Sequence, residues 1–174
     1  MMSFGKGGNM VLSDRDIRTY LKEEKIVLRP APDLKESLGS CSLDLRLGEV
    51  AKKVDSHLVK KKTQKKTVTL SPGEFLLATT LEYMELPDTL CGMLHGRSSL
   101  GRKGIMVHST APLIDAGFRG KIVLELFNSG NEPVTLEIHE RICGLTFHQL
   151  SSPAEVPYYK KKDAKYLGQT KPKL

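Results

Sequence analysis

Three short stretches of this 174-residue chain bring together residue types that could do chemistry. The first, residues 96–102, reads Gly-Arg-Ser-Ser-Leu-Gly-Arg. Glycines let backbone N–H groups approach a ligand, so this loop could cradle a polyphosphate, above all if Ser98 opens a short helix. An Arg-Ser-Ser turn is also an ordinary helix cap, and the stretch alone leaves both interpretations open.

The second stretch, residues 121–128, carries one carboxylate in an apolar run. Alternation along a strand places Glu125 on one face with Val123 and Phe127, and three aliphatic residues on the other. A carboxylate buried in such a row tends to have a raised pKa, which suits a general base or a proton shuttle. A strand-end position or an interface ion pair with an arginine explains the pattern equally well.

The third stretch, residues 111–120, contains Asp115 directly before a Gly-containing turn. A short carboxylate held beside a tight turn can accept a hydrogen bond from a sugar hydroxyl. Aspartate before glycine is also common turn chemistry, so this stretch is weak when taken alone.

The net charge of +7 is concentrated in two places. Residues 51–67 carry a net charge of +6 and residues 158–174 carry +5, which leaves −4 for the rest of the chain. Aromatic residues make up only 6%, tryptophan is absent, and neither lysine cluster adjoins a nucleic-acid recognition motif. Nucleic-acid binding is therefore disfavoured, and the first cluster is typical of a solvated hairpin or a guarded edge strand.

The cysteines and the hydropathy argue against a disulfide-bonded, zinc-binding or membrane-spanning protein. Cys41, Cys91 and Cys143 are widely spaced without a C-x-x-C pair, which predicts buried free thiols rather than disulfides or a zinc site. No apolar run approaches the ~18 residues of a membrane span, and residues 1–10 lack a secretory signal. We therefore expect a cytoplasmic protein.

The elements that must position these stretches are mostly strands. Ser13 and Asp16 predict a capping box, followed by a helix over residues 13–24. Runs typical of strands, separated by turn signals, cover residues 41–47, 67–70, 74–81, 90–95, 106–108, 121–128, 134–138 and 141–149. Residues 1–9 form a glycine-rich extension. The pattern predicts a mainly β domain, namely a sandwich, jelly roll or barrel, with a short N-terminal helix and a helical turn near Ser98.

Four motifs in order resemble the dCTP deaminase family. They are residues 96–102, residues 106–120, residues 122–130, and Pro157-Tyr158 followed by the D-A-K-Y-x-x-Q of residues 163–169. The resemblance runs from about Met10 to Gln169. It implies a distorted jelly-roll β-barrel of the trimeric dUTPase type over residues 10–157 and a basic tail over residues 158–174 that closes over a triphosphate. It also implies a homotrimer with active sites between subunits.

The same resemblance implies conversion of dCTP and water into dUTP and ammonia. Glu125 matches the catalytic proton carrier, and Ser98 and Arg102 match residues that hold the water and Glu125. The remaining matched substrate contacts are Arg97, Ser99, Leu100 and Gly101 in the first loop, Ala111, Val123 and Leu124 at the base, Asp115 at the sugar 3′-hydroxyl, Phe118 beside the sugar, and Tyr158, Lys165 and Gln169 at the triphosphate.

The family resemblance implies Mg²⁺ held by the triphosphate and suggests feedback inhibition by dTTP. It implies no zinc, and the sequence agrees. Zinc-dependent cytosine deamination uses H-x-E with a downstream P-C-x-x-C, and neither pattern occurs in this sequence.

Two alternatives stay open. Some members also hydrolyse dUTP to dUMP. Phe118 where dUTPases carry tyrosine, Gly144 where glutamine is common, and the lysine-rich end in place of a glycine-rich motif favour deamination alone. A non-catalytic nucleotide-sensing or nucleic-acid-binding trimer, using residues 51–67, is the alternative of another class.

Overall fold

The computed structural model describes residues 10–54, 57–60 and 66–172. The predicted extension at residues 1–9 lies outside the described residues. So do the side chains of residues 52–65, which make up most of the lysine-rich segment predicted as an alternative contact surface.

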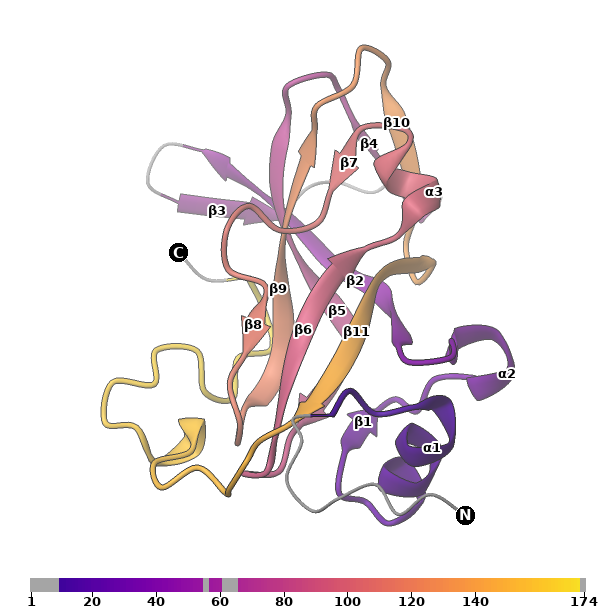
Figure 1. The fold of residues 1–174 in the computed structure, drawn as a ribbon. Coiled ribbons are helices and arrows are strands. Elements are labelled where there is room, and N and C mark those ends of the chain that lie inside the picture. Colours follow the sequence, from indigo (N-terminus) through magenta and orange to yellow (C-terminus); the bar gives the residue numbers. More distant parts are fainter. Residues whose placement is uncertain (1–9, 55–56, 61–65, 173–174) are drawn as a thin grey trace.

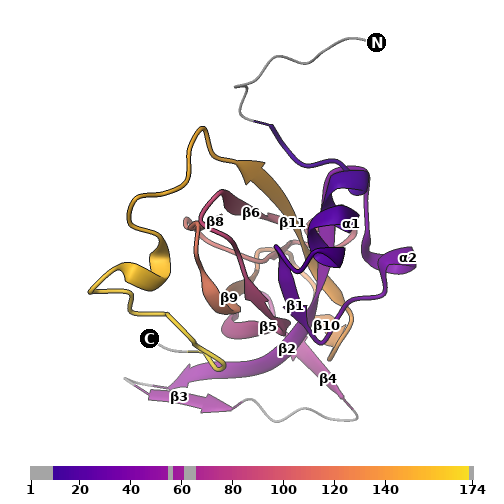
Figure 2. The same ribbon diagram turned by 90° about the horizontal axis from the view of Figure 1, so that it is seen from below.

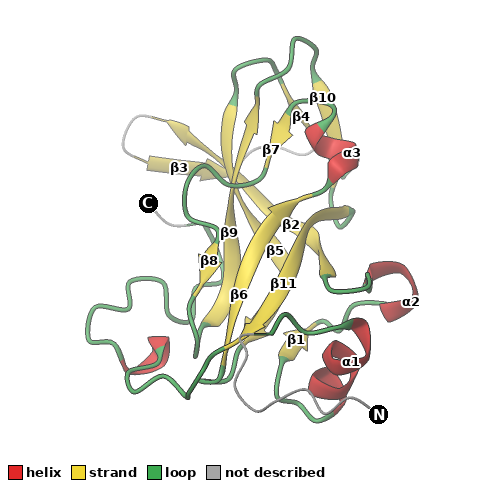
Figure 3. Ribbon diagram, viewed as in Figure 1, coloured by secondary structure: helices red, strands yellow, loops and turns green. Residues whose placement is uncertain are grey.

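One curled antiparallel sheet makes up most of the protein (Figures 1 and 3). Its strands follow the order β7 (Ile105–Met106), β9 (Arg119–Asn128), β5 (Phe75–Glu85), β2 (Leu43–Val54), β11 (Arg141–Gln149), β6 (Leu90–Gly96) and β8 (Leu113–Ile114). Off this path, β1 (Val27–Arg29) pairs with β5, β3 (His57–Lys60) pairs with β2, and β4 (Thr67–Leu70) pairs with β10 (Val134–Glu137). The helical elements are α1 (Asp14–Lys22), α2 (Leu34–Ser37), α3 (Ser98–Gly101) and the 3₁₀ turn η1 (Tyr158–Lys160). The mainly β prediction is therefore confirmed.

The sheet curls around an interior (Figure 2), and the buried hydrophobic side chains form one core cluster. Alternate residues of each strand point inward, and those of β2, β5, β9 and β11 are fully buried, among them Leu45, Leu76, Leu124, Leu126 and Phe147. Each such side chain stabilises the fold by about 1.5–3 kcal/mol. The same alternation turns the intervening residues of β9, including Glu125, toward the outer face.

Helix α1 begins after Ser13 as predicted, but the expected reciprocal capping box is absent. The Ser13 hydroxyl donates to the Asp16 carboxylate at 3.1 Å, and the Ser13 side chain caps no backbone N–H of this helix. Aspartate is one methylene shorter than the glutamate usual at this position, so its carboxylate meets the serine hydroxyl instead of the backbone. The helix packs on the sheet through the fully buried Ile17.

Gly48 marks a bulge, whereas the sequence predicted the end of a strand there. Strand β2 continues to Val54, and its pairing with β5 shifts register between Leu47 and Val50. A Cβ atom at Gly48 would lie 2.6 Å from the Thr80 carbonyl oxygen, so only glycine allows β2 to approach β5 so closely. The short elements β1, α2 and β8 were not predicted because they contain too few residues to show periodicity.

A buried ion pair fastens β2 to β5, and its loss should destabilise the fold. Arg46 Nε lies 2.6 Å from Glu82 Oε1, the Arg46 N–H donates to Oε2 at 2.9 Å, and the Glu82 side chain is 0% exposed. Replacing Arg46 by methionine leaves this carboxylate without its cation and should lower the free energy of unfolding by about 3 kcal/mol. Urea unfolding measures the change.

The control for this prediction is an exposed pair on α1, where Arg15 Nε lies 3.5 Å from Asp16. Replacing Arg15 by methionine should change the free energy of unfolding by less than about 0.5 kcal/mol. Equal losses for the two variants would show that the buried pair contributes no more than a surface contact.

Candidate active site

The edge of β9 that faces away from β5 offers backbone groups to a ligand. The Lys121 N–H donates to the Gln169 carbonyl at 2.8 Å and the Glu125 N–H donates to the Val107 carbonyl at 3.0 Å, both across this edge. In an antiparallel ladder alternate residues direct both backbone groups to one side, so the N–H and C=O of Val123 point the same way. Among the described residues neither group of Val123 has a partner outside the sheet.

This edge opens into a cleft of about 560 Å³, which we call the β9 cleft. Seven predicted site residues line it: Ala111, Asp115, Phe118, Val123, Glu125, Tyr158 and Gln169. Six further lining residues were not predicted: Phe75, Leu77, Leu113, Ile114, Ile122 and Tyr166. All six are apolar or aromatic residues whose types give no chemical signal, which is why motif analysis missed them.

Glu125 is half-buried in the single chain, so the prediction of a buried carboxylate is corrected. Its Oε2 accepts a hydrogen bond from the Ser109 N–H at 2.7 Å, which fixes the carboxylate beside the loop after β7. The edge of β9 before Glu125 stays open because the strand beyond it, β7, has only 2 residues and pairs with β9 at Phe127 and Asn128. The carboxylate is therefore oriented but accessible.

The turn after Asp115 is shaped by a close approach of the chain. Gly117 has φ +77°, and a Cβ there would lie 2.6 Å from Pro157 Cβ. The Phe118 N–H donates to the Asp115 carbonyl at 3.1 Å, and the Phe118 ring lies 5.8 Å from the Tyr158 ring, centroid to centroid. The turn thus places an aspartate and two aromatic rings on one wall of the cleft.

The C-terminal segment folds back over β9 on the side of β8, opposite α1 (Figures 1 and 2). The Gly168 N–H donates to the Arg119 carbonyl at 2.8 Å, and Gln169 Nε2 donates to the Lys121 carbonyl at 2.9 Å. Gln169 is 4% exposed, and its Oε1 is buried without a partner among the described residues. Lys165 is exposed and does not line the cleft, with its Nζ 5.4 Å from the Tyr166 ring.

The loop of residues 96–102 lies elsewhere on the same chain. Ser98 opens the predicted helical turn, α3, and Arg97 precedes it. Arg97 Nε lies 3.1 Å from Asp44 Oδ2, and its Nη1 donates to the Arg141 carbonyl at 3.0 Å. Burial raises the pKa of Asp44, while the nearby Arg97 and Arg141 oppose that shift. The guanidinium is thereby held in a fixed direction.

A second cleft of about 580 Å³, the α3 cleft, contains Arg97, Ser98 and Ser99 but neither Glu125 nor Asp115. Figure 1 shows α3 at the end of the molecule near β4 and β10, with the tail at the opposite end. The side chain of Leu100 is buried in the core. Arg102 is exposed, and within the described chain its guanidinium has no hydrogen bond or ion pair.

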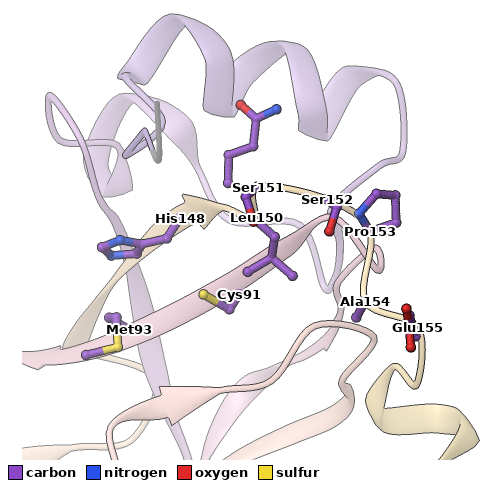
Figure 4. A pocket seen from close by; sticks show the side chains of 10 residues that line it. Cys91, Met93, His148, Leu150, Ser151, Ser152, Pro153, Ala154 and Glu155 are labelled. Carbon is purple, nitrogen blue, oxygen red and sulfur yellow. The ribbon is translucent and has the colours of Figure 1, made fainter. Parts of the chain in front are cut away.

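A cleft of about 700 Å³ is lined by residues of β6, by the end of β11 and by residues 150–155, and it contains none of the predicted site residues. In Figure 4 Leu150 points toward Cys91, and His148 lies beside Met93. Burial raises the pKa of the Cys91 thiol, which disfavours the nucleophilic thiolate.

All three cysteines are free, but only Cys143 is buried, so the expectation of three buried thiols is wrong for the exposed Cys41. Cys41 lies in the loop before β2, where the alternation of the strand has not yet begun. In the described ranges no group of three or more His, Cys, Asp or Glu side chains is arranged to hold a metal ion. Nor does any described helix have the length and hydropathy needed to span a membrane.

The fold is that of the dUTPase-like β proteins. The solved 2′-deoxycytidine 5′-triphosphate deaminase of Agrobacterium tumefaciens superposes with a TM-score of 0.68 at 22% identity, over 82% of this chain and 48% of that chain. A dUTPase of the Staphylococcus aureus phage phi11 superposes with a TM-score of 0.53 at 15% identity, over 74% of this chain and 93% of that chain. The predicted fold type is confirmed.

Sequence comparison is more specific. A family model described as dCTP deaminase-like matches residues 11–150. A dUMP-forming dCTP deaminase of Dictyoglomus thermophilum is 46% identical, covering 94% of this chain and 92% of that protein. A dCTP deaminase of Thermomicrobium roseum is 45% identical with the same coverage. The chain belongs to the dCTP deaminase family.

Proposed function

We propose that this protein catalyses the hydrolytic deamination of dCTP to dUTP and ammonia. The observation that carries the proposal is the pair of open backbone groups at Val123, two residues from the oriented carboxylate of Glu125. Cytosine carries an amino donor beside acceptors on the ring, so the Val123 carbonyl can accept from the amine while its N–H donates to the ring. That pairing places C4 of the base close to Glu125.

Glu125 then moves protons. It takes a proton from water as the water oxygen bonds to C4, and it passes that proton to N3 of the ring. A second proton, from the attached hydroxyl, reaches the amine, the C4–N4 bond breaks, and ammonia leaves with uracil as the product base. The Ser109 N–H at 2.7 Å keeps the carboxylate directed into the cleft through these steps.

Ser98 and Arg102 complete the site from a neighbouring subunit of a homotrimer. Three observations support this: Ser98 lies in a different cleft from Glu125, Arg102 is exposed and unpaired among the described residues, and Glu125 is only half-buried. In a cyclic trimer each subunit can supply α3 to the next subunit's β9 cleft, which makes three equivalent sites. Arg102 would then pair with Glu125, and the Ser98 hydroxyl would hold the water.

The triphosphate is bound by Arg97, which precedes α3, and by Lys165 of the tail, which runs over residues 158–174. Arg97 is held in place by Asp44, and Ser98 and Ser99 offer hydroxyls and N–H groups beside it. Mg²⁺ enters with the phosphates and neutralises part of their charge. A solved phage dUTPase of this fold is described as coordinating a structural Mg(II) ion.

Replacing Lys165 by alanine should raise KM for dCTP with little change in kcat. Its exposed ammonium is free to meet a phosphate, and a lost charge-assisted contact weakens binding by on the order of 1–3 kcal/mol. The matched control is Lys162→Ala, an exposed lysine of the same tail that has no contact among the described residues. Equal KM values for both variants would remove Lys165 from the phosphate site.

The proposed function is tested by ammonia release from dCTP, beside CTP and dCMP, with nucleotide products separated by chromatography. We expect one ammonia for each dCTP consumed and little reaction with CTP, because Phe118 packs beside the sugar. The name of the 46%-identical relative favours a second candidate, in which dUMP and pyrophosphate are the products. Pyrophosphate detection separates the two, and adding dTTP tests feedback inhibition. Absence of ammonia would support a non-catalytic nucleotide-binding trimer instead.

A further inference from the structure

Asp115 is held by a lysine that lies outside the β9 cleft. Lys161 Nζ donates to Asp115 Oδ2 at 2.8 Å, and both side chains are about 40% exposed (41% and 40%). Within the described chain, the other oxygen of this carboxylate, Oδ1, has no hydrogen-bond partner. The carboxylate is therefore fixed at one oxygen and open at the other.

Lys161 contacts Asp115 from outside the β9 cleft. A small cleft of about 210 Å³ adjoins the β9 cleft and shares Leu113, Asp115 and Tyr158 with it. Lys161 lines this small cleft but not the β9 cleft. The same ammonium lies 5.6 Å from the centre of the Tyr158 ring. Lys161 thus contacts two residues of the β9 cleft without occupying the cleft.

We propose that Lys161 is a positioning residue that orients Asp115 toward the 3′-hydroxyl of the deoxyribose. By taking Oδ2, it presents Oδ1 to the β9 cleft, where the sugar hydroxyl can donate to it. This inference rests on the proposed function. It also links recognition of the sugar to the docking of the tail, because the lysine that orients Asp115 belongs to the tail.

The neighbouring lysines do not share this role. Lys160 lies over the Tyr159 ring at 5.8 Å, and Lys162 has no contact among the described residues. The hydrogen bond from Lys161 to Asp115 raises the pKa of this lysine and so favours its charged form. Lys160 and Lys162 can therefore serve as controls for Lys161.

The test compares kcat/KM for dCTP with kcat/KM for 2′,3′-dideoxy-CTP, which lacks the 3′-hydroxyl, by ammonia release. Lys161→Met should lower the value for dCTP by about 5-fold, as expected for an exposed ion pair, and leave the dideoxy value unchanged. Lys162→Met should change neither value, and Lys161→Arg should keep most of the wild-type kcat/KM for dCTP. In an Asp115→Asn background, Lys161→Met should have no further effect on the ratio.

An equal loss with both nucleotides, or no loss with either, would overturn the inference, since a purely structural tail contact does not sense one hydroxyl. Wild-type protein, measured in parallel, distinguishes failure of the proposed function from failure of the inference about Lys161. If it releases no ammonia from dCTP, the proposed function fails. If it does, and the Lys161→Met ratio matches the wild-type ratio, only the role of Lys161 fails.

Discussion

Replacing Glu125 by glutamine is expected to abolish ammonia release from dCTP while leaving the nucleotide bound. An amide cannot take a proton from water, so turnover should fall by about 10³-fold or more. The fold should be unaffected, because the Glu125 side chain is half-buried and its one hydrogen bond, from the Ser109 N–H, can be accepted by the glutamine oxygen. The variant should therefore separate chemistry from binding.

Steady-state ammonia release and dCTP binding by calorimetry measure the two effects. Glu132→Gln is the control, because it removes an exposed carboxylate at the tip of the loop before β10. That variant should turn over dCTP as the wild type does. If Glu125→Gln kept more than a small fraction of the wild-type rate, another group would have to carry the protons.

Replacing Arg102 by alanine should have the second largest effect, lowering kcat by about 10²-fold. In the proposed trimer this guanidinium lies against Glu125 of the next subunit, where it holds the carboxylate charged and directed at the water. In the single chain it is exposed, without a partner in the described ranges, so its removal should leave the melting temperature of the subunit unchanged.

Lys103 provides the matched control for Arg102, since it is the adjacent exposed cation. Lys103→Ala should retain near wild-type kcat. A comparable fall in both variants would indicate a general effect of charge near α3, whereas an unchanged rate in Arg102→Ala would show that the residue lies away from the reacting atoms.

The strands of this fold were predictable wherever a long alternating run met clear turn signals. The predicted strands at residues 67–70 and 141–149 coincide with β4 and β11, and the run at 121–128 falls within β9. The predicted end of a strand at Gly48 was wrong, because this glycine allows a close approach between two strands. Short elements such as β8 were missed because they form by pairing with a neighbouring strand of the sheet.

Several residues of the candidate site were predictable from the sequence, but their arrangement was not. The motifs brought out Glu125 and Asp115, and the structure places both in one cleft. Alternation alone could not tell whether the outer face of β9 would be covered, so the burial of Glu125 was misjudged. The contact from Lys161 to Asp115 depends on the packing of Pro157 against Gly117, which no local pattern in the sequence reveals.

Co-expression of Glu125→Gln and Arg102→Ala subunits in equal amounts, carrying different affinity tags, tests whether each active site is shared between two subunits. Each variant alone is inactive, but in mixed trimers some sites combine the intact Glu125 of one subunit with the intact Arg102 of its neighbour. Every mixed trimer contains one complete site out of three, so the doubly tagged fraction should recover roughly one third of the wild-type dCTP deaminase rate. Mixed trimers that release no more ammonia than either parent variant would contradict a site shared between subunits.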